Sequence, residues 1–315
     1  MRRWYISFHG GNGPHAWNNI HVFDLDGAPL GKALDTHTLP GGLALRELRG
    51  FAFGPDGDLY VANAYKDASQ ILRFAGTLGP DGRHPFHAIY SERHAANPGL
   101  DHPFDVVFGP DRNLYVASQD TSLVGRYFGP DASDGRPGDP MPHPPGLPAS
   151  SSRHLLPGTF VPSAAHLPTG VKGIRRAIFG LEGDLYVADR DADRIKRYDG
   201  RSGAFKWEYR HQPLTAPVHL LVRVPDGVLL VGSRDRDAIF AIETETGAVA
   251  TLVEPKAGGL KAPAGMALGP DGLLYVCSRE TRQVLRFDPF TGSPSASPFI
   301  DDLNDAPEFI MLVDH

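Results

Sequence analysis

One phrase recurs along this chain: a Gly-Pro-Asp turn followed by a short alternating strand. It reads GPDGDLYVANA from Gly54, GPDRNLYVASQ from Gly109, GLEGDLYVADR from Gly180, VPDGVLLVGSR from Val224 and GPDGLLYVCSR from Gly269. Proline presets φ for a tight turn, and glycine supplies the positive φ that completes it. The residues after the turn alternate as they do in a strand with two differently packed faces. A turn and strand repeated at a long period predict a radial β-architecture.

A complete repeat contains four strands. An apolar run such as GFAF or DVVF precedes each turn, and the LYVA-type strand follows the turn. A third strand comes next, as in QILRF and QVLRF, and a more variable fourth strand follows it. Four antiparallel strands per repeat describe one blade of a β-propeller.

The two ends of the chain complete a sixth blade. Counted through the C-terminus, Tyr275 and Tyr5 are 45 residues apart, which equals the spacing between Leu230 and Tyr275. Residues 4–7 read as a second strand without a first, and residues 306–313 read as a first strand without a second. The sequence therefore predicts an all-β, six-bladed propeller in which N- and C-terminal strands together close one blade.

The whole chain, residues 1–315, is expected to form this one domain, with a long insertion at 129–168. That tract is rich in Pro and Ser and lengthens one repeat, and we expect a loop on the channel-mouth face of the propeller. Loops of this length usually have a function or lack order. A lid over a site and a plain surface loop both fit the sequence.

Composition narrows the classes of partner. A net charge of −6 does not favour binding to nucleic acid or to an anionic membrane surface, both of which are negatively charged. Cys277 is the only cysteine, so no internal disulfide can form. No apolar window is long enough to cross a bilayer, and no dinucleotide fingerprint is present. We expect a cytoplasmic monomer that has a small-molecule substrate and binds no nucleic acid, membrane, nucleotide or flavin.

The repeated phrase, together with YVADRDADRI around Asp189, resembles the six-bladed propellers of the NHL-repeat and senescence-marker/gluconolactonase-like group. The resemblance covers nearly the whole chain and implies the fold. It does not imply one activity, because this architecture carries lactonases, lyases, amidating lyases and purely binding domains.

Two site patterns of that group match this chain only in part. The gluconolactonase-like enzymes hold a divalent metal through a Glu, an Asn and an Asp at strand starts. Glu308 could stand for the Glu, but no Asn matches, and Ala264 precedes Gly265 where the group usually has an Asp. The amidating lyases carry a His directly after the first-strand Pro, whereas His219 comes one position later.

Aligning the first strands on their proline positions gives a row of residues two positions further on. The row consists of Gly50, Asp105, Arg176, His219, Gly265 and Phe309. A carboxylate, a guanidinium and an imidazole at one level suit proton transfer and charge stabilisation. We predict His219 as general base or metal ligand, Asp105 as its orienter or a second ligand, and Arg176 as stabiliser of an oxyanion. The alternative is a channel plugged by an Asp–Arg salt bridge.

A second row follows the second strands. It consists of His9, Gln119, Arg190, Arg234 and Arg279. Its three arginines, with His9 and His15 from the longest loop, are candidates for binding an anionic substrate. We favour the simpler interpretation, in which each arginine pairs with the carboxylate that follows it and contributes little.

A divalent metal site is a further option. His219, Asp105 and Glu308 offer imidazole and carboxylate ligands that suit Zn, Mn, Fe or Ni. The sequence thus predicts a hydrolase or lyase that acts on a small polar or anionic molecule at the channel mouth, with or without a metal. The alternative is a non-catalytic propeller that binds a protein or peptide through its loop face.

Overall fold

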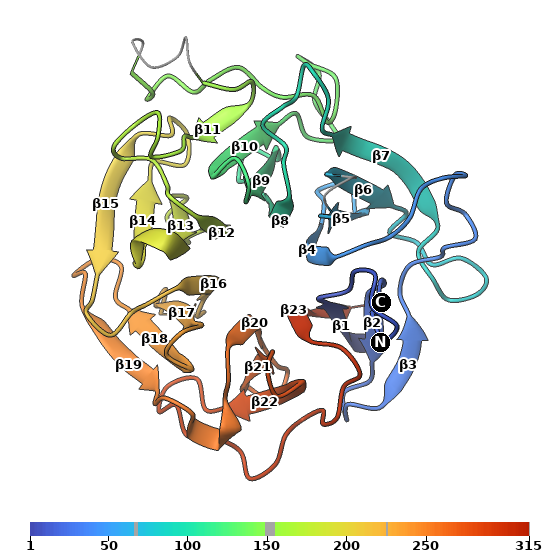
Figure 1. Ribbon diagram of the computed structural model, residues 1–315, viewed down its shortest axis with the longest axis vertical. Helices are drawn as coiled ribbons and strands as arrows, with labels where there is room; N and C mark the ends of the chain where they lie inside the picture. The colour runs from blue at the N-terminus through green and yellow to red at the C-terminus, as the bar shows by residue number, and fades with distance from the viewer. Residues whose placement is uncertain (66–68, 149–154, 225, 315) are drawn as a thin grey trace. The chain divides into compact units, whose positions relative to one another are not determined.

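The computed structural model describes residues 1–65, 69–148, 155–224 and 226–314 (Figure 1). These residues form six antiparallel sheets, and the helical elements among them are the short turns η2 (Arg190–Ala192) and η3 (Ala257–Gly259). The predicted fold class, an all-β six-bladed propeller, is confirmed. Among the described residues, no helix has the length and apolar character that crossing a membrane requires.

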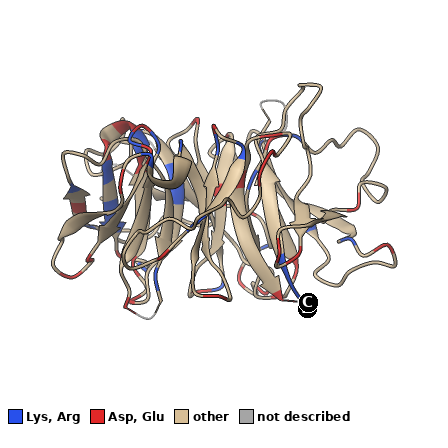
Figure 2. Ribbon diagram, turned by 90° about the horizontal axis from the view of Figure 1, so that it is seen from below, with Lys and Arg blue, Asp and Glu red and all other residues tan. Residues whose placement is uncertain are grey.

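The chain divides into two compact units. The first contains Met1–Ala33, Leu45–Leu48 and Tyr209–His315, and the second contains Leu34–Ala44 and Arg49–Glu208. The prediction of a single domain over residues 1–315 stays a prediction. Figure 2 shows that acidic and basic residues lie mostly in turns and loops, while the strands are largely uncharged.

Three sheets belong to the first unit. One has the order β23 (Pro307–Asp314), β1 (Arg2–Phe8), β2 (His21–Phe23) and β3 (Pro29–Lys32). The next consists of β16 (Pro217–Val222), β17 (Leu229–Ser233), β18 (Ala238–Ile242) and β19 (Val249–Val253). The third consists of β20 (Pro263–Leu268), β21 (Leu274–Ser278) and β22 (Gln283–Phe287).

The pairing of β23 with β1 confirms that both ends of the chain build one blade. Trp4 lies opposite Leu312, and Tyr5 lies opposite Met311. Trp4 is fully buried, so the central part of this junction belongs to the core of the first unit.

The β20–β22 sheet has three strands among the described residues, where four were predicted. Pro294 and Ile300 make isolated bridges to β22 in the place of a fourth strand. Proline has no N–H to donate to a ladder. Pro294 and Pro298 in this segment therefore account for isolated bridges instead of a continuous strand.

Three four-stranded sheets belong to the second unit, except for Leu48 at the start of β4 and Tyr209 and Arg210 at the end of β15, which belong to the first unit. One consists of β4 (Leu48–Phe53), β5 (Leu59–Asn63), β6 (Gln70–Phe74) and β7 (Phe86–Glu92). The next consists of β8 (Pro103–Phe108), β9 (Leu114–Ser118), β10 (Leu123–Tyr127) and β11 (Thr159–Val161). The third consists of β12 (Ile174–Phe179), β13 (Leu185–Asp189), β14 (Arg194–Tyr198) and β15 (Phe205–Arg210).

Strand β11 corrects the prediction of an unbroken loop over 129–168. Val161 pairs with Val124 of β10, and Phe160 is fully buried against Tyr115. The tract therefore supplies the fourth strand of its blade and part of the core. His154, which the sequence places in this tract, lies outside the described residues.

The repeated phrase has a structural cause beyond its turn. In three of the repeated phrases the Asp of the turn accepts a hydrogen bond from the hydroxyl of the Tyr four residues later. The bonds are Tyr60 to Asp56 at 3.0 Å, Tyr115 to Asp111 at 3.0 Å and Tyr275 to Asp271 at 2.9 Å. The turn and the second strand are thus fixed to each other in each of these blades.

Backbone hydrogen bonds confirm how the repeats align. In five blades the residue just after the second strand donates its N–H to the carbonyl of the residue just before the first strand. The donors are His9, Gln119, Arg190, Arg234 and Arg279. Three of the acceptors, His102, Ala216 and Ala262, have positive φ, which is uncommon for residues other than glycine.

Candidate functional site

In the second unit the first-strand row brings Asp105 and Arg176 together. Asp105 Oδ1 accepts a hydrogen bond of 2.7 Å from Arg176 Nη1, and both side chains are buried. Gly50, the third member of the row in this unit, lies against them. A Cβ at Gly50 would be 2.3 Å from Asp105 Oδ1, so only glycine permits this approach.

Burial decides the protonation chemistry of Asp105. It raises the pKa of this carboxyl to about 6, although Arg176 and the N–H groups of Val106 and Ala177 act in the opposite direction. Asp105 Oδ2 has no hydrogen-bond partner among the described residues. A carboxyl with a pKa near neutrality and an oxygen available for a proton is the kind of group that general acid–base catalysis uses.

The raised pKa of Asp105 predicts how the protein's stability depends on pH. The folded pKa of about 6 lies above the ordinary value of 3.8, so the folded protein binds this proton more tightly than the unfolded chain does. The contribution of this group to stability therefore increases as the pH falls through 6 towards 3.8. Between pH 7 and pH 4 we expect the wild type to gain about 2 kcal/mol relative to Asp105→Asn. Urea denaturation of both proteins at each pH measures this gain. A difference in unfolding free energy that does not change with pH would contradict it.

In the first unit the same row contains His219, Gly265 and Phe309. His219 is buried on β16, and the centre of its ring lies 5.4 Å from that of Phe309 on β23. Gly265 on β20 allows this contact, because a Cβ there would be 2.6 Å from Phe309 Cα.

A second polar cluster in the first unit joins residues that the sequence had assigned to different roles. Arg279 Nε lies 2.7 Å from Glu308 Oε1, and His9 Nδ1 lies 3.3 Å from the same oxygen. The Glu308 side chain is 6% exposed and that of His9 is 43% exposed, so a buried carboxylate supports an accessible imidazole.

The two contacts of His9 Nδ1 suit different positions of the ring proton. Arg279 Nη2 lies 2.9 Å from this nitrogen, and a guanidinium only donates hydrogen bonds. With Arg279 as donor, Nδ1 is the acceptor, so the neutral ring carries its proton on Nε2. With Glu308 as acceptor, Nδ1 must be protonated. The cluster therefore offers a partner to Nδ1 whether or not this nitrogen carries the ring proton.

The other predicted substrate-binding residues remain separate from this cluster. His15 is exposed on the loop after β1, and Arg190 lies 3.7 Å from Asp191 in the second unit. Arg234 is half-buried at the end of β17. The predicted pairing of each arginine with the next carboxylate holds for Arg190, whereas Arg279 pairs with Glu308 from a different strand.

The predicted catalytic set draws on both units. Asp105 and Arg176 lie in the second unit and His219 lies in the first, so their meeting at one channel mouth stays a prediction. The proposed metal set of His219, Asp105 and Glu308 is divided in the same way. Within the described residues, no three His, Cys, Asp or Glu side chains gather as metal ligands would. The metal set therefore stays a prediction.

Asp305 is a structural contributor that sequence reasoning missed. Its Oδ2 accepts the backbone N–H of Gly10 at 2.9 Å and that of Trp17 at 2.8 Å. The ring of Trp17 stacks on His21, with centroids 4.0 Å apart. The loop that begins at His9 is therefore anchored at both ends. In the sequence, this role is indicated only by the position of Asp305, a carboxylate just before the strand that begins at Pro307.

A buried lysine was also missed. The Lys196 ammonium lies 3.1 Å from Asp189 Oδ2 and donates to the carbonyl of Gly170. Asp189 in turn accepts the N–H groups of Lys172 and Gly173. The signal was a lysine where the third strands of other blades have Leu72, Phe240, Leu285, Gly125 and His21. These contacts make the pair a structural anchor for the segment before β12.

No protein-family model matches the chain. By sequence it is similar to peptidyl-glycine alpha-amidating monooxygenase B of Xenopus laevis, with 27% identity over 115 residues. The match covers 34% of this chain and 13% of the length of that protein.

Several solved structures are similar over almost the whole chain. One is a catalytically inactive His-to-Ala variant of virginiamycin B lyase from Staphylococcus aureus with quinupristin, at 15% identity over 99% of this chain and 92% of that chain, with a TM-score of 0.60. The periplasmic gluconolactonase of Pseudomonas aeruginosa has 16% identity over 99% of both chains, with a TM-score of 0.58. A chain of a nidogen/laminin complex has 13% identity over 99% of this chain and 98% of that chain, with a TM-score of 0.64. At these identities the likeness shows the fold, and it confirms the predicted resemblance to the gluconolactonase-like propellers at that level.

Proposed function

We propose that this protein is a hydrolase or lyase that acts on a small polar or anionic molecule. The buried Asp105–Arg176 pair carries the proposal, because it combines a carboxyl whose pKa is about 6 with a guanidinium 2.7 Å away. A buried ion pair is weak evidence of a purely stabilising role, since apolar residues often stabilise a core equally well.

In the proposed mechanism Asp105 transfers a proton and Arg176 stabilises negative charge that develops on the substrate. Oδ1 of Asp105 is occupied by Arg176, so the proton is exchanged at Oδ2. His219 is assigned the role of general base on the strength of its position in the repeat. His9, held by Glu308 and Arg279, is a further proton-transfer group in the first unit.

The similar structures support this class of activity without naming a substrate. They include a lyase and a lactonase, and the curated relative is an amidating enzyme. A substrate panel should therefore contain an aldonolactone, such as δ-gluconolactone, and the depsipeptide quinupristin. Ring opening is followed by proton release and by mass spectrometry.

On whichever compound is turned over, Asp105→Asn is expected to lower kcat/KM by at least about 100-fold, the usual contribution of a general acid–base group. Arg176→Lys keeps the charge but loses the planar donor geometry, and we expect a smaller loss that appears mainly in kcat. Asp302→Asn is the matched control, because Asp302 is exposed and asparagine also accepts its positive φ.

Two results would contradict the proposal. One is the absence of turnover across the panel by folded wild-type protein. The other is a loss of activity in Asp105→Asn that follows only from unfolding, with the folded fraction retaining the wild-type rate. Stability measurements on the same preparations separate these cases.

A binding function without catalysis is the second candidate. It is favoured by the likeness to a chain of a nidogen/laminin complex. In that case Asp105→Asn would change stability alone.

A further inference from the structure

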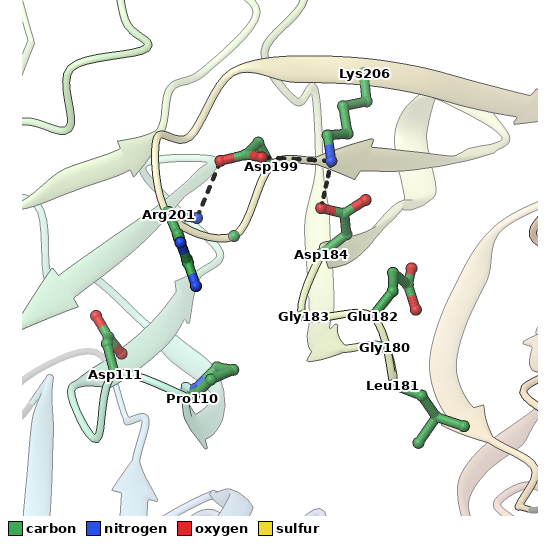
Figure 3. Close-up of a pocket in the computed structure, with 11 residues that line it drawn as sticks. Pro110, Asp111, Gly180, Leu181, Glu182, Gly183, Asp184, Asp199, Arg201 and Lys206 are labelled. Atoms are coloured by element: carbon green, nitrogen blue, oxygen red, sulfur yellow. Dashed lines mark hydrogen bonds and ion pairs between the residues drawn. The ribbon is translucent and has the colours of Figure 1, made fainter.

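A cavity of about 790 Å³ lies in the second unit, between the β8–β9, β12–β13 and β14–β15 turns (Figure 3). It is found where β8 and β12 end, whereas Asp105 and Arg176 lie nearer the start of these strands. The cavity is therefore separate from the pair on which the proposed function rests. Its volume is in the range that accommodates a small organic ligand.

The β12–β13 turn departs from the repeated phrase where it lines this cavity. Leu181 stands in the place of the turn proline, and Glu182 stands in the place of the aspartate. Glu182 still accepts the hydroxyl of Tyr186, as the shorter aspartates do in other blades, so the turn does not require the longer side chain. Leu181 is 65% exposed, so the apolar side chain that replaces the turn proline is not buried in the core.

The β14–β15 turn departs from its equivalents in the same way. Turns closed by the same backbone hydrogen bonds begin at Asp199, Glu243 and Asp288. Arg201 stands at the third position of the first of these turns, where the other two have Glu245 and Phe290. The turn geometry therefore does not select an arginine, yet Arg201 lines the cavity.

The charged side chains around the cavity differ in whether they have a partner of opposite charge. Lys206 Nζ lies 2.7 Å from Asp184 Oδ1 and 3.3 Å from Asp199 Oδ2, so these three groups neutralise one another in part. Within the described part of the chain, the Arg201 guanidinium has no hydrogen-bond or ion-pair partner, and its side chain points into the open space (Figure 3). Asp111 and Glu182 lie on different turns around that space.

We propose that this cavity binds a basic amino acid with a free carboxylate, of the lysine or arginine type. The carboxylate of the ligand would pair with Arg201, the one lining cation without a partner among the described residues. Its two cationic groups would pair with Asp111, whose Oδ2 accepts only from the uncharged Asn113 and Tyr115 among the described residues, and with Oε2 of Glu182, because Oε1 of Glu182 already pairs with Arg197. The aliphatic part of the ligand would contact the exposed Leu181 side chain.

The test is isothermal titration of the full chain with L-lysine, cadaverine and glutarate. Cadaverine has both amines of lysine but no carboxylate, and glutarate has carboxylates but no amine. We expect L-lysine to bind at least about 10-fold more tightly than either, because charged hydrogen bonds to both kinds of group contribute. Arg201→Ala should weaken L-lysine binding by about 10-fold or more and leave cadaverine binding unchanged.

Two further variants sharpen the test. The double substitution Leu181→Pro, Glu182→Asp restores the phrase of the other blades, so it should fold and lose L-lysine binding. Arg83→Ala removes an arginine outside the cavity that is paired with Asp81, and it should bind L-lysine as the wild type does. The proposal is overturned if folded wild type shows no heat with L-lysine at about 10 mM, if cadaverine binds as tightly, or if Arg201→Ala binds L-lysine unchanged. None of these readouts depends on the activity assigned to Asp105.

Discussion

Removal of residues 307–315 is expected to abolish the folded state at room temperature. The deletion takes away β23, which pairs with β1 from Arg2 opposite Asp314 to Phe8 opposite Pro307. It also uncovers apolar side chains of β1 that β23 now buries, Trp4 and Ile6 among them. Each large apolar side chain contributes about 1.5–3 kcal/mol by burial, and a domain is stable by only about 5–15 kcal/mol.

Circular dichroism melting and size-exclusion chromatography measure the outcome. We expect no cooperative melting transition and elution as aggregates, because β1 would present an unpaired apolar edge. The matched control is truncation after Val313. It removes the exposed Arg2–Asp314 ion pair, which contributes at most about 1 kcal/mol. A 307–315 deletion that stays monomeric and melts as the wild type does would show that the blade does not need its terminal strand.

Gly265→Ala should have the second largest effect. The new Cβ would lie 2.6 Å from Phe309 Cα and 2.7 Å from Ile310 N, so β20 and β23 would have to separate. Backbone atoms cannot rotate away as a flexible side chain can. Overpacking of this kind costs about 1–3 kcal/mol or more. We expect a loss at or above the upper end of that range, measured by urea denaturation.

Gly232→Ala is the control for the intrinsic effect of the substitution. Gly232 lies in the buried strand β17, and a Cβ there would be 3.6 Å from Pro263 Cβ, an ordinary contact. Alanine should therefore be tolerated at this position. Equal losses of stability in the two variants would show that close packing of β20 on β23 is not what requires glycine at Gly265.

The repeat alignment predicted the first-strand row because blades are built from equivalent hydrogen bonds. Once Pro103 is equated with its counterparts, the position of Asp105 follows, and so does its neighbour Arg176 in the next blade. Strand β11 could not be found in this way. It is three residues long, follows a long insertion and has no turn phrase before it, so only its pairing with β10 identifies it.

The partners of long side chains were the least predictable part of the site. Glu308 was assigned to a metal and Arg279 to a pair with the next carboxylate, but the two residues contact each other and His9. Glu308 lies in β23, whereas His9 and Arg279 directly follow β1 and β21. A repeat alignment specifies where each backbone position lies, whereas the reach of a side chain decides which partner it meets.

The joining of β1 to β23 also has a consequence for the order of folding. Residues 2–8 can pair with β2 soon after synthesis, but their other partner begins at Pro307. At about 5–20 residues per second, a ribosome needs roughly 15–60 s to make the intervening chain. During that interval the apolar face of β1 is open to other nascent strands. The blade that contains β1 is thus completed only when β23 has been made, and folding yield should depend on how well the open edge is protected until translation passes residue 314.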